Sequence, residues 1–191
     1  MANISVFGKG NMGKAIAGNF EDAGNTVSFV AENDAVATLG DIVVFAVPYP
    51  AVAGIIEKYR AELAGKVLVD ITNPVDFATF DDLVVPADSS AAKVIAEALP
   101  DTKVVKGFNT TFAATLASKQ VAGEHQTTVM LAGDDADAKA TVTVALEGSQ
   151  LAVIDAGALK RARELEAMGF LQISLAAAEK IGWTGGFGVF N

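Results

Sequence analysis

The sequence predicts an α/β protein with a doubly wound, mainly parallel sheet and helices on both of its faces. Short, mainly apolar runs with few charged residues alternate with longer helix-like segments along the chain. The runs are continuously hydrophobic, which is typical of strands that are buried on both faces. A glycine-rich turn follows the first run, so the chain opens as a strand–turn–helix unit.

Each element follows from this alternation in chain order. Strands are expected at 4–7, 26–30, 42–47, 66–70, 103–108, 127–133 and 151–155. Helices are expected between them at 11–23, 50–63, 89–98, 112–119 and 134–147, with a long C-terminal helix near 158–180. In this last helix, residues near helical spacing predict a stripe that faces the core, namely Leu159, Ala162, Leu165, Phe170, Ile173 and Leu175.

Composition narrows the classes of function. The 191 residues include 51% hydrophobic ones, the net charge is −9, and there is no cysteine. Thiol catalysis, disulfides and thiolate metal sites are therefore excluded, and a cytoplasmic location fits. The negative charge argues against nucleic acid as a partner, and no apolar run reaches the roughly 20 residues of a membrane-spanning helix. The single histidine, His125, lies in a polar stretch and is expected in a surface loop, so no metal site is expected.

The turn after the first strand carries a motif with a physical explanation. Gly8-Lys9-Gly10-Asn11-Met12-Gly13 fits the pattern G-x-G-x-x-G, directly after a strand and before a helix. In a dinucleotide-binding unit the first glycine permits the tight turn, the second lets the pyrophosphate approach, and the third lets the helix pack closely. The phosphates would lie at the helix N-terminus, which attracts anions. We therefore expect a Rossmann-like fold, the alternative being an ordinary glycine turn.

This interpretation also predicts the domain organisation. Residues 1–191 are expected to form one NAD(P)-binding domain, because no linker or repeat interrupts the chain. Residues 1–120 would be the dinucleotide-binding core. Residues 121–191 would be a smaller extension that packs on it.

The choice between NAD and NADP depends on the end of the second strand. Ala31 and Glu32 stand there without a nearby Arg or Lys. An acidic residue about 20 positions beyond the glycines usually binds the ribose hydroxyls of NAD, whereas a basic one accommodates the 2′-phosphate of NADP. From these residues alone NAD is favoured. Lys9 and Lys14 are the nearby cations of the first unit, and solvent exposure is an equal alternative for each.

Two further strand ends combine prolines with polar side chains. Pro48 and Pro50 end the third expected strand and leave backbone groups free at the carboxyl edge of the sheet, where ligands bind in such folds. The segment DITNP has the same feature, since Pro74 ends the strand and Asp70 and Asn73 offer hydrogen bonds there. A plain strand-to-helix turn is the alternative interpretation of the proline turn.

Aromatic residues near these edges allow more than one interpretation. In KGFNT, the ring of Phe108 and the polar residues beside it could hold a flat ring and a carboxamide, or Phe108 could pack in the core. Gly157 belongs to the site or is only a loop glycine. Tyr49 and Tyr59 are expected at the start and end of a helix, away from the other motifs.

Five motifs in this order resemble the NADPH-dependent deazaflavin (coenzyme F420) reductase family and its dinucleotide-binding relatives: GKGNMGKAIA, VVFAVPYPAV, VDITNP, VVKGFNT and VIDAGALKRARELE. The resemblance covers nearly the whole chain. It implies a compact α/β protein that binds NADP at the strand tips and passes hydride between nicotinamide and a deazaflavin or another flat acceptor. It also implies a homodimer through the C-terminal helix and the tail GWTGGFGVF, which alternatively forms a flap or a packed terminus.

The resemblance further implies which residues line the cofactor. The pyrophosphate would contact Gly8, Lys9, Gly10, Asn11 and Met12, and the adenosine and ribose would lie over Ala46, Val47 and Pro48. The nicotinamide would be framed by Thr72, Asn73, Pro74, Phe108, Asn109 and Thr110, and the far side would be closed by Ala156 and Gly157. The family typically holds the 2′-phosphate with a Ser-Arg pair after its second strand, whereas Ala31 and Glu32 occupy these places here.

The predicted function is that of an NAD(P)H-dependent reductase. Its cofactor would be NADP, with NAD as the alternative, and its partner a small electron acceptor or donor such as a deazaflavin, flavin or quinone. Hydride transfer to such rings can draw its proton from water, so positioning suffices and no catalytic acid–base residue is expected. The alternatives are a non-catalytic redox sensor or partner subunit that binds the dinucleotide, and a small dehydrogenase of imino or hydroxy acids.

Overall fold

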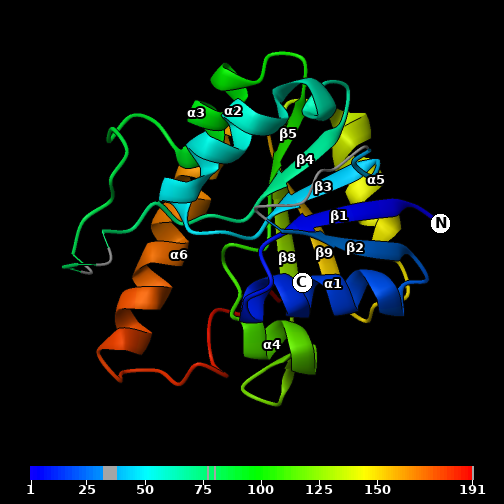
Figure 1. Ribbon diagram of the computed structural model, residues 1–191. Coiled ribbons are helices and arrows are strands. Elements are labelled where there is room, and N and C mark those ends of the chain that lie inside the picture. Colours follow the sequence, from blue (N-terminus) through cyan, green and yellow to red (C-terminus); the bar gives the residue numbers. More distant parts are fainter. Residues whose placement is uncertain (32–37, 77, 80, 191) are drawn as a thin grey trace.

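The computed structural model describes residues 1–31, 38–76, 78–79 and 81–190, and Figure 1 shows the arrangement of its elements. One seven-stranded sheet has the order β2-β1-β3-β4-β5-β8-β9. Its strands are β1 Asn3–Phe7, β2 Thr26–Val30, β3 Ile42–Phe45, β4 Val67–Asp70, β5 Lys103–Lys106, β8 Thr128–Ala132 and β9 Ala152–Gly157. A separate small ladder pairs β6 Gln120–Val121 with β7 His125–Gln126.

Strand direction divides the sheet into two parts. The strands β1 to β5 are parallel to their neighbours. The strand β8 is antiparallel to β5 and parallel to β9. The mainly parallel sheet that the sequence predicts is therefore confirmed, and β8 and β9 extend the same sheet as the first five strands.

Helices cover both faces of the sheet (Figure 1). One apolar core joins α1, α4 and α5 to the sheet, and a second joins α2, α3 and the start of α6 to the opposite face. The helices are α1 Asn11–Asp22, α2 Val52–Leu63, α3 Ala91–Ala98, α4 Ala113–Ser118, α5 Ala136–Ala145 and α6 Ala162–Ala177, with short 3-10 turns η1 Tyr49–Ala51 and η2 Leu159–Arg161. This arrangement confirms the predicted doubly wound fold.

The apolar runs form strands because both of their faces become buried. In β3 all four residues are buried, and Val44 packs in one core while Val43 and Phe45 pack in the other. The topology then defines a ligand edge. After β2 the chain passes to the other side of β1, so β1 and β3 flank the point where strand order reverses, which is where such sheets bind ligands.

The buried face of α6 differs from the predicted apolar stripe. Ala162 and Leu165 are buried as expected, but Phe170, Ile173 and Leu175 are only partly buried. Their places on the buried face are taken by Glu166, Gly169, Gln172 and Ala176. The correction has a physical reason: the middle of α6 packs on polar loops at the end of the sheet, as described below. None of the helices in the described ranges is both long and apolar enough to cross a membrane.

The C-terminal tail packs on its own chain beyond α6. Trp183 packs on Phe112, with ring centroids 4.9 Å apart, and Phe190 meets His125 edge to face at 4.8 Å. The N–H of Ala122 donates to the carbonyl of Thr184 at 2.7 Å. The tail therefore covers the region of α4 and the β6–β7 ladder, as a packed terminus does.

Candidate nucleotide-binding site

The glycine turn after β1 is shaped by two close approaches of the backbone. A Cβ atom on Gly8 would lie 2.1 Å from the carbonyl oxygen of Ala46, and its φ of +105° disfavours any other residue. A Cβ atom on Gly13 would lie 2.1 Å from the carbonyl oxygen of Gly8. The turn thus fits tightly against the end of β3, and α1 fits tightly against the turn.

Gly10 has no such constraint within the protein. A Cβ atom there would have no heavy atom within 4 Å, and its φ of −72° and ψ of −176° suit any residue. Gly10 is also the N-cap of α1, and because it has no side chain it cannot cap the first N–H groups of the helix. The space in front of the first turn of α1 is therefore open, and N–H groups at a helix N-terminus suit an anion there.

A cavity of about 540 Å³ continues from the glycine turn along η1 and α2. Its walls include Phe7, Gly8, Lys9, Val30, Ala31, Val47, Pro50, Ala51, Gly54, Ile55, Lys58 and Tyr59. Tyr59 packs on Phe7 with ring centroids 5.0 Å apart. The expectation that Tyr59 lies away from the motifs is wrong, because α2 folds back over the end of β1.

The other residues that were predicted to contact the pyrophosphate, the adenosine and the ribose lie around the same turn. Ala46 and Met12 are partly buried and pack on the first core, whereas Lys9, Asn11 and Pro48 are exposed. Ala31 is in the cavity wall, but Glu32 lies outside the described residues. The prediction for Glu32 therefore stays open.

The loops after β4 and β5 are joined by a pair of asparagines. The Asn73 Nδ2 donates to the carbonyl of Asn109 at 2.9 Å, and the Asn109 Nδ2 donates to the Asn73 Oδ1 at 2.9 Å. The Asn109 Nδ2 also donates to the carbonyl of Leu165 in α6 at 2.8 Å. Two segments 36 residues apart in the chain are thereby fixed to each other and to the C-terminal helix.

Three buried oxygen atoms at these loops lack a hydrogen-bond partner within the described part of the chain: Thr72 Oγ1, Asn109 Oδ1 and Thr110 Oγ1. Buried polar atoms are nearly always paired, and each exception needs an explanation. These oxygens can accept from an amide group, and the threonine hydroxyls can also donate to one. The arrangement therefore fits a ligand that brings its own hydrogen-bonding groups.

The structure decides between the two interpretations of Phe108 in favour of core packing. Its side chain is fully buried and meets Phe20 of α1 at a centroid distance of 6.0 Å. Its φ of +61° turns the chain, so that the ring enters the core while Asn109 returns to the loop. The ring of Phe108 therefore cannot frame a ligand at this edge, which corrects that detail of the expected site.

Beneath these loops Asp70 belongs to a buried charged cluster whose other members, Lys106 and Glu166, were not predicted from the sequence. The Lys106 Nζ lies 2.8 Å from a carboxylate oxygen of Asp70 and 2.8 Å from one of Glu166, and it also donates to the carbonyl of Thr72. The Asp70 Oδ1 accepts from the N–H of Thr72 at 2.9 Å. We call Asp70, Lys106 and Glu166 the charged cluster. Two signals were available: Asp70 ends the apolar strand β4, and Lys106 ends β5 directly after two valines.

Glu166 of α6 also caps the N-terminus of α3. Its two oxygens accept from the N–H groups of Ala91 and Ala92 at 2.8 and 3.2 Å. Burial raises the pKa of Glu166, and the neighbouring Lys106 opposes this shift. Burial also raises the pKa of Tyr49, followed by the negative charges of Glu166 and Asp70. Tyr49 is thus within the field of the charged cluster, contrary to the expectation that it lies apart.

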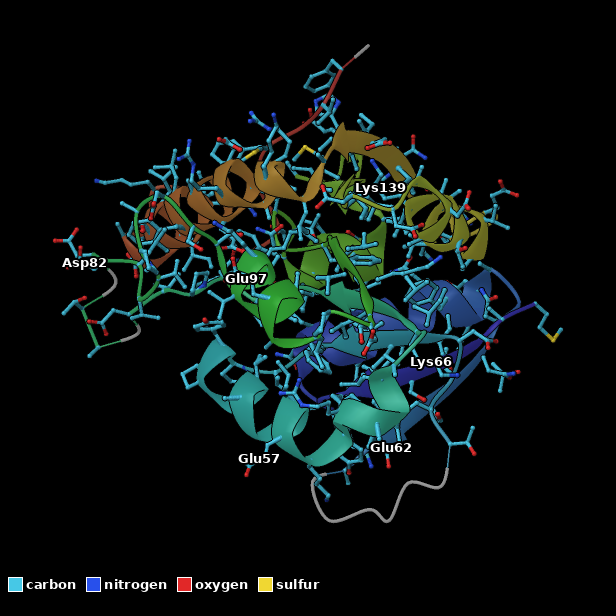
Figure 2. All side chains as sticks on the ribbon, turned by 90° about the horizontal axis from the view of Figure 1, so that it is seen from above. Glu57, Glu62, Lys66, Asp82, Glu97 and Lys139 are labelled. Atoms are coloured by element: carbon cyan, nitrogen blue, oxygen red, sulfur yellow. The ribbon has the colours of Figure 1, made fainter. Side chains whose placement is uncertain are left out.

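An ion pair holds the backbone at Ala156 and Gly157, the residues that were predicted to close the far side of the nucleotide site. The Lys139 Nζ of α5, labelled in Figure 2, lies 2.7 Å from the Asp155 Oδ1 and 3.0 Å from the carbonyl of Gly157. The hydrogen bond from Lys139 holds the pKa of Asp155 below its usual range. Gly157 has a φ of +103°, so the backbone itself explains this glycine. In the described residues no cluster of three or more His, Cys, Asp or Glu side chains could hold a metal ion.

Replacing Gly169 by alanine should destabilise the fold by about 1–3 kcal/mol through overpacking. The added Cβ would lie 2.5 Å from the Asn73 Oδ1 and 2.8 Å from the carbonyl oxygen of Asn109. Urea denaturation measures the change, with Gly18→Ala as the control, because a Cβ at Gly18 in α1 meets nothing within 4 Å. That control should gain up to roughly 1 kcal/mol from helix propensity. Equal gains in both variants would contradict the close packing of α6 on the loops.

The fold and the glycine turn define a dinucleotide-binding protein of the Rossmann type, and comparison with known proteins gives the family. A family model for coenzyme F420-dependent NADP oxidoreductases matches residues 29–74. The chain is 31% identical over 158 residues to an F420-dependent NADP reductase from Methanocaldococcus jannaschii, covering 81% of this chain and 70% of that relative. The chain therefore belongs to the F420-dependent NADP reductase family, a class of NADP-dependent oxidoreductases.

Solved structures agree with this family. A crystal structure of a candidate F420-dependent NADP reductase from Arthrobacter sp. FB24 has a TM-score of 0.83 at 27% identity, over 100% of both chains. The NADP-bound pyrroline carboxylate reductase of Plasmodium falciparum has a TM-score of 0.60 at 14% identity, over 94% of this chain and 64% of that one. At this low identity the second likeness concerns the fold alone.

Proposed function

We propose that this protein binds NADPH across the carboxyl edge of its sheet and transfers hydride between the nicotinamide and a flat acceptor of the deazaflavin type. One observation carries the proposal. The open space at Gly10 follows β1, and three buried oxygens without a partner among the described residues follow β4 and β5 of the same parallel set. The name of the relative from Methanocaldococcus jannaschii supports both NADP and F420 as ligands.

The residues present fit the cofactor part by part. The N–H groups at the start of α1 would hold the pyrophosphate in front of Gly10, beside Lys9 and Asn11. The cavity between the glycine turn and α2 would hold the adenosine against Val47 and Ala31. Thr72, Asn73, Asn109 and Thr110 would hold the nicotinamide carboxamide, with Pro48 and Pro74 nearby and Ala156 and Gly157 on the far side.

Catalysis by positioning follows from the side chains at this edge. When bound, the nicotinamide supplies the hydride. The asparagine pair and the threonine oxygens fix a carboxamide and so orient the ring, which lowers the entropic part of the barrier. His125 is exposed on β7 and packs on Phe190, so it is not proposed as an acid. Since burial raises the pKa of Tyr49, its hydroxyl stays protonated at neutral pH.

Preference for NADPH over NADH is proposed to depend on Lys9 and Lys58. These are the two cations in the wall of the described cavity, and Lys58 lies over the ring of Tyr59 at 5.0 Å. Lys58→Met should weaken NADPH binding roughly tenfold, because a charge-assisted hydrogen bond is worth about 1.5 kcal/mol. NADH binding should stay unchanged. Lys66→Met is the matched control, because Lys66 precedes β4 at the opposite edge of the sheet (Figure 2).

Titration of the purified protein tests the proposed function. Nucleotide fluorescence and the quenching of Trp183 would report the binding of NADPH and NADH, and steady-state oxidation would then be followed with F420, a flavin and a quinone. Tighter binding of NADPH and turnover with F420 are expected. Binding without turnover by any acceptor would favour the non-catalytic redox sensor, and absence of binding would refute the proposal.

We also propose the homodimer that the family resemblance implies. The exposed apolar side chains of Leu171, Trp183 and Phe190 lie on α6 and the tail and offer a surface for it. Sedimentation equilibrium of the intact protein tests this, with a mass of twice 19.6 kDa expected. A mass of one chain at all concentrations would refute it.

A further inference from the structure

The charged cluster places two carboxyl groups and a single lysine in the interior, away from solvent. The side chains of Asp70 and Lys106 are 0% exposed and that of Glu166 is 1% exposed. Among the described residues, Glu166 accepts from the N–H groups of Ala91 and Ala92 and from the Lys106 ammonium. A carboxylate can accept all of these bonds, whereas a protonated carboxyl group would need a further acceptor for its O–H. With both carboxyl groups ionised, the two carboxylates and one ammonium of the cluster carry one net negative charge.

This charge lies directly beneath the loops that line the site. Lys106 donates to the carbonyl of Thr72, and Asp70 accepts from the N–H of the same residue. Asn109, whose Oδ1 has no partner among the described residues, donates to the carbonyl of Leu165, the neighbour of Glu166 in α6. The cluster is thus hydrogen-bonded to one of the two segments that would hold the carboxamide of the nucleotide, and it is joined to the other through Leu165.

We propose that the charged cluster biases the site toward the oxidised nucleotide, because its excess negative charge attracts the cationic pyridinium ring of NADP⁺ and not the neutral ring of NADPH. The inference rests on the proposed function, since it requires the nicotinamide at these loops. Interactions between charges are much stronger in a water-excluded interior than in water. The bias lowers the reduction potential of the bound nucleotide, so bound NADPH is a stronger hydride donor than free NADPH.

Removing one negative charge tests the bias. In Glu166→Gln the ratio of the dissociation constants, Kd(NADP⁺) over Kd(NADPH), should rise roughly three- to tenfold for a unit charge near the ring. The affinity for 2′,5′-ADP, which has the adenosine half without a nicotinamide, should stay unchanged. Glu164→Gln is the matched control, since Glu164 is on the same helix but 44% exposed and paired with Arg163. This control should leave the ratio as it is in the unaltered protein.

The outcomes separate this inference from the proposed function. If the unaltered protein binds neither NADP⁺ nor NADPH, both fall together. If it binds both and Glu166→Gln leaves the ratio unchanged, only the charge bias is overturned. Equal weakening of NADP⁺, NADPH and 2′,5′-ADP would also overturn it, because that pattern reflects a general structural loss. Asp70→Asn removes a negative charge from the same cluster and must raise the ratio too, which keeps the test decisive if Glu166→Gln does not fold.

Discussion

Replacing Gly10 by alanine is expected to weaken nucleotide binding by about a hundredfold or more while leaving the fold intact. A single methyl group suffices to weaken binding, because a pyrophosphate must approach the backbone of this glycine closely. A hundredfold loss of affinity corresponds to about 2.7 kcal/mol. The fold should tolerate it, since the added Cβ meets no heavy atom within 4 Å and the backbone angles suit alanine. Titration with NADPH and a thermal melt measure the two effects.

This substitution separates a phosphate cradle from an ordinary turn. Gly18→Ala, which adds a methyl group further along α1 where nothing lies within 4 Å, should leave binding unchanged. Gly8→Ala should instead damage the fold itself, because its Cβ would overlap the carbonyl oxygen of Ala46. Normal NADPH binding by Gly10→Ala would mean that the pyrophosphate does not lie in front of the glycine turn.

Replacing Lys106 by methionine is expected to lower the free energy of unfolding by about 3–5 kcal/mol at neutral pH. Lys106 is the cation of the charged cluster, and its loss leaves Asp70 and Glu166 buried together without a counter-charge. Lys93→Met is the control, because Lys93 and Glu97 form an exposed pair 3.8 Å apart. Its effect should stay within about 0.5 kcal/mol. Urea denaturation of both variants gives the comparison.

The loss in Lys106→Met should depend on pH with a defined sign. Burial already raises the pKa of Glu166, and removal of the opposing Lys106 charge raises it further. A carboxyl group whose folded-state pKa is above its unfolded value favours folding below the unfolded value and loses this contribution as pH rises through the folded value. The variant should therefore be least destabilised near pH 4 and more so toward neutral pH, whereas a pH-independent loss would contradict the role of the buried charges.

The strands and the glycine turn could be predicted because their signals are local. A continuous apolar run such as 42–47 must be buried on both faces, and three glycines at fixed spacing serve a turn that the flanking strand and helix already define. The fully buried β3 and the contacts of Gly8 and Gly13 agree with this reasoning. Phe108 and α6 show where such prediction ends. Neither an aromatic residue nor a helical stripe of apolar residues indicates which distant segments it will pack against.

The sequence by itself determined the fold class, the order of the elements and the edge of the sheet at which a dinucleotide would bind, because hydrophobic runs and turn glycines act on their own neighbours in the chain. Only the tertiary structure decided that Glu166 of α6 joins Asp70 and Lys106, 60 or more residues earlier, and caps α3. The local sequence does not indicate that a charged residue on a helix will be buried, because such residues usually face solvent. Its burial depends on a counter-charge and N–H donors that distant segments supply, and only folding brings these together.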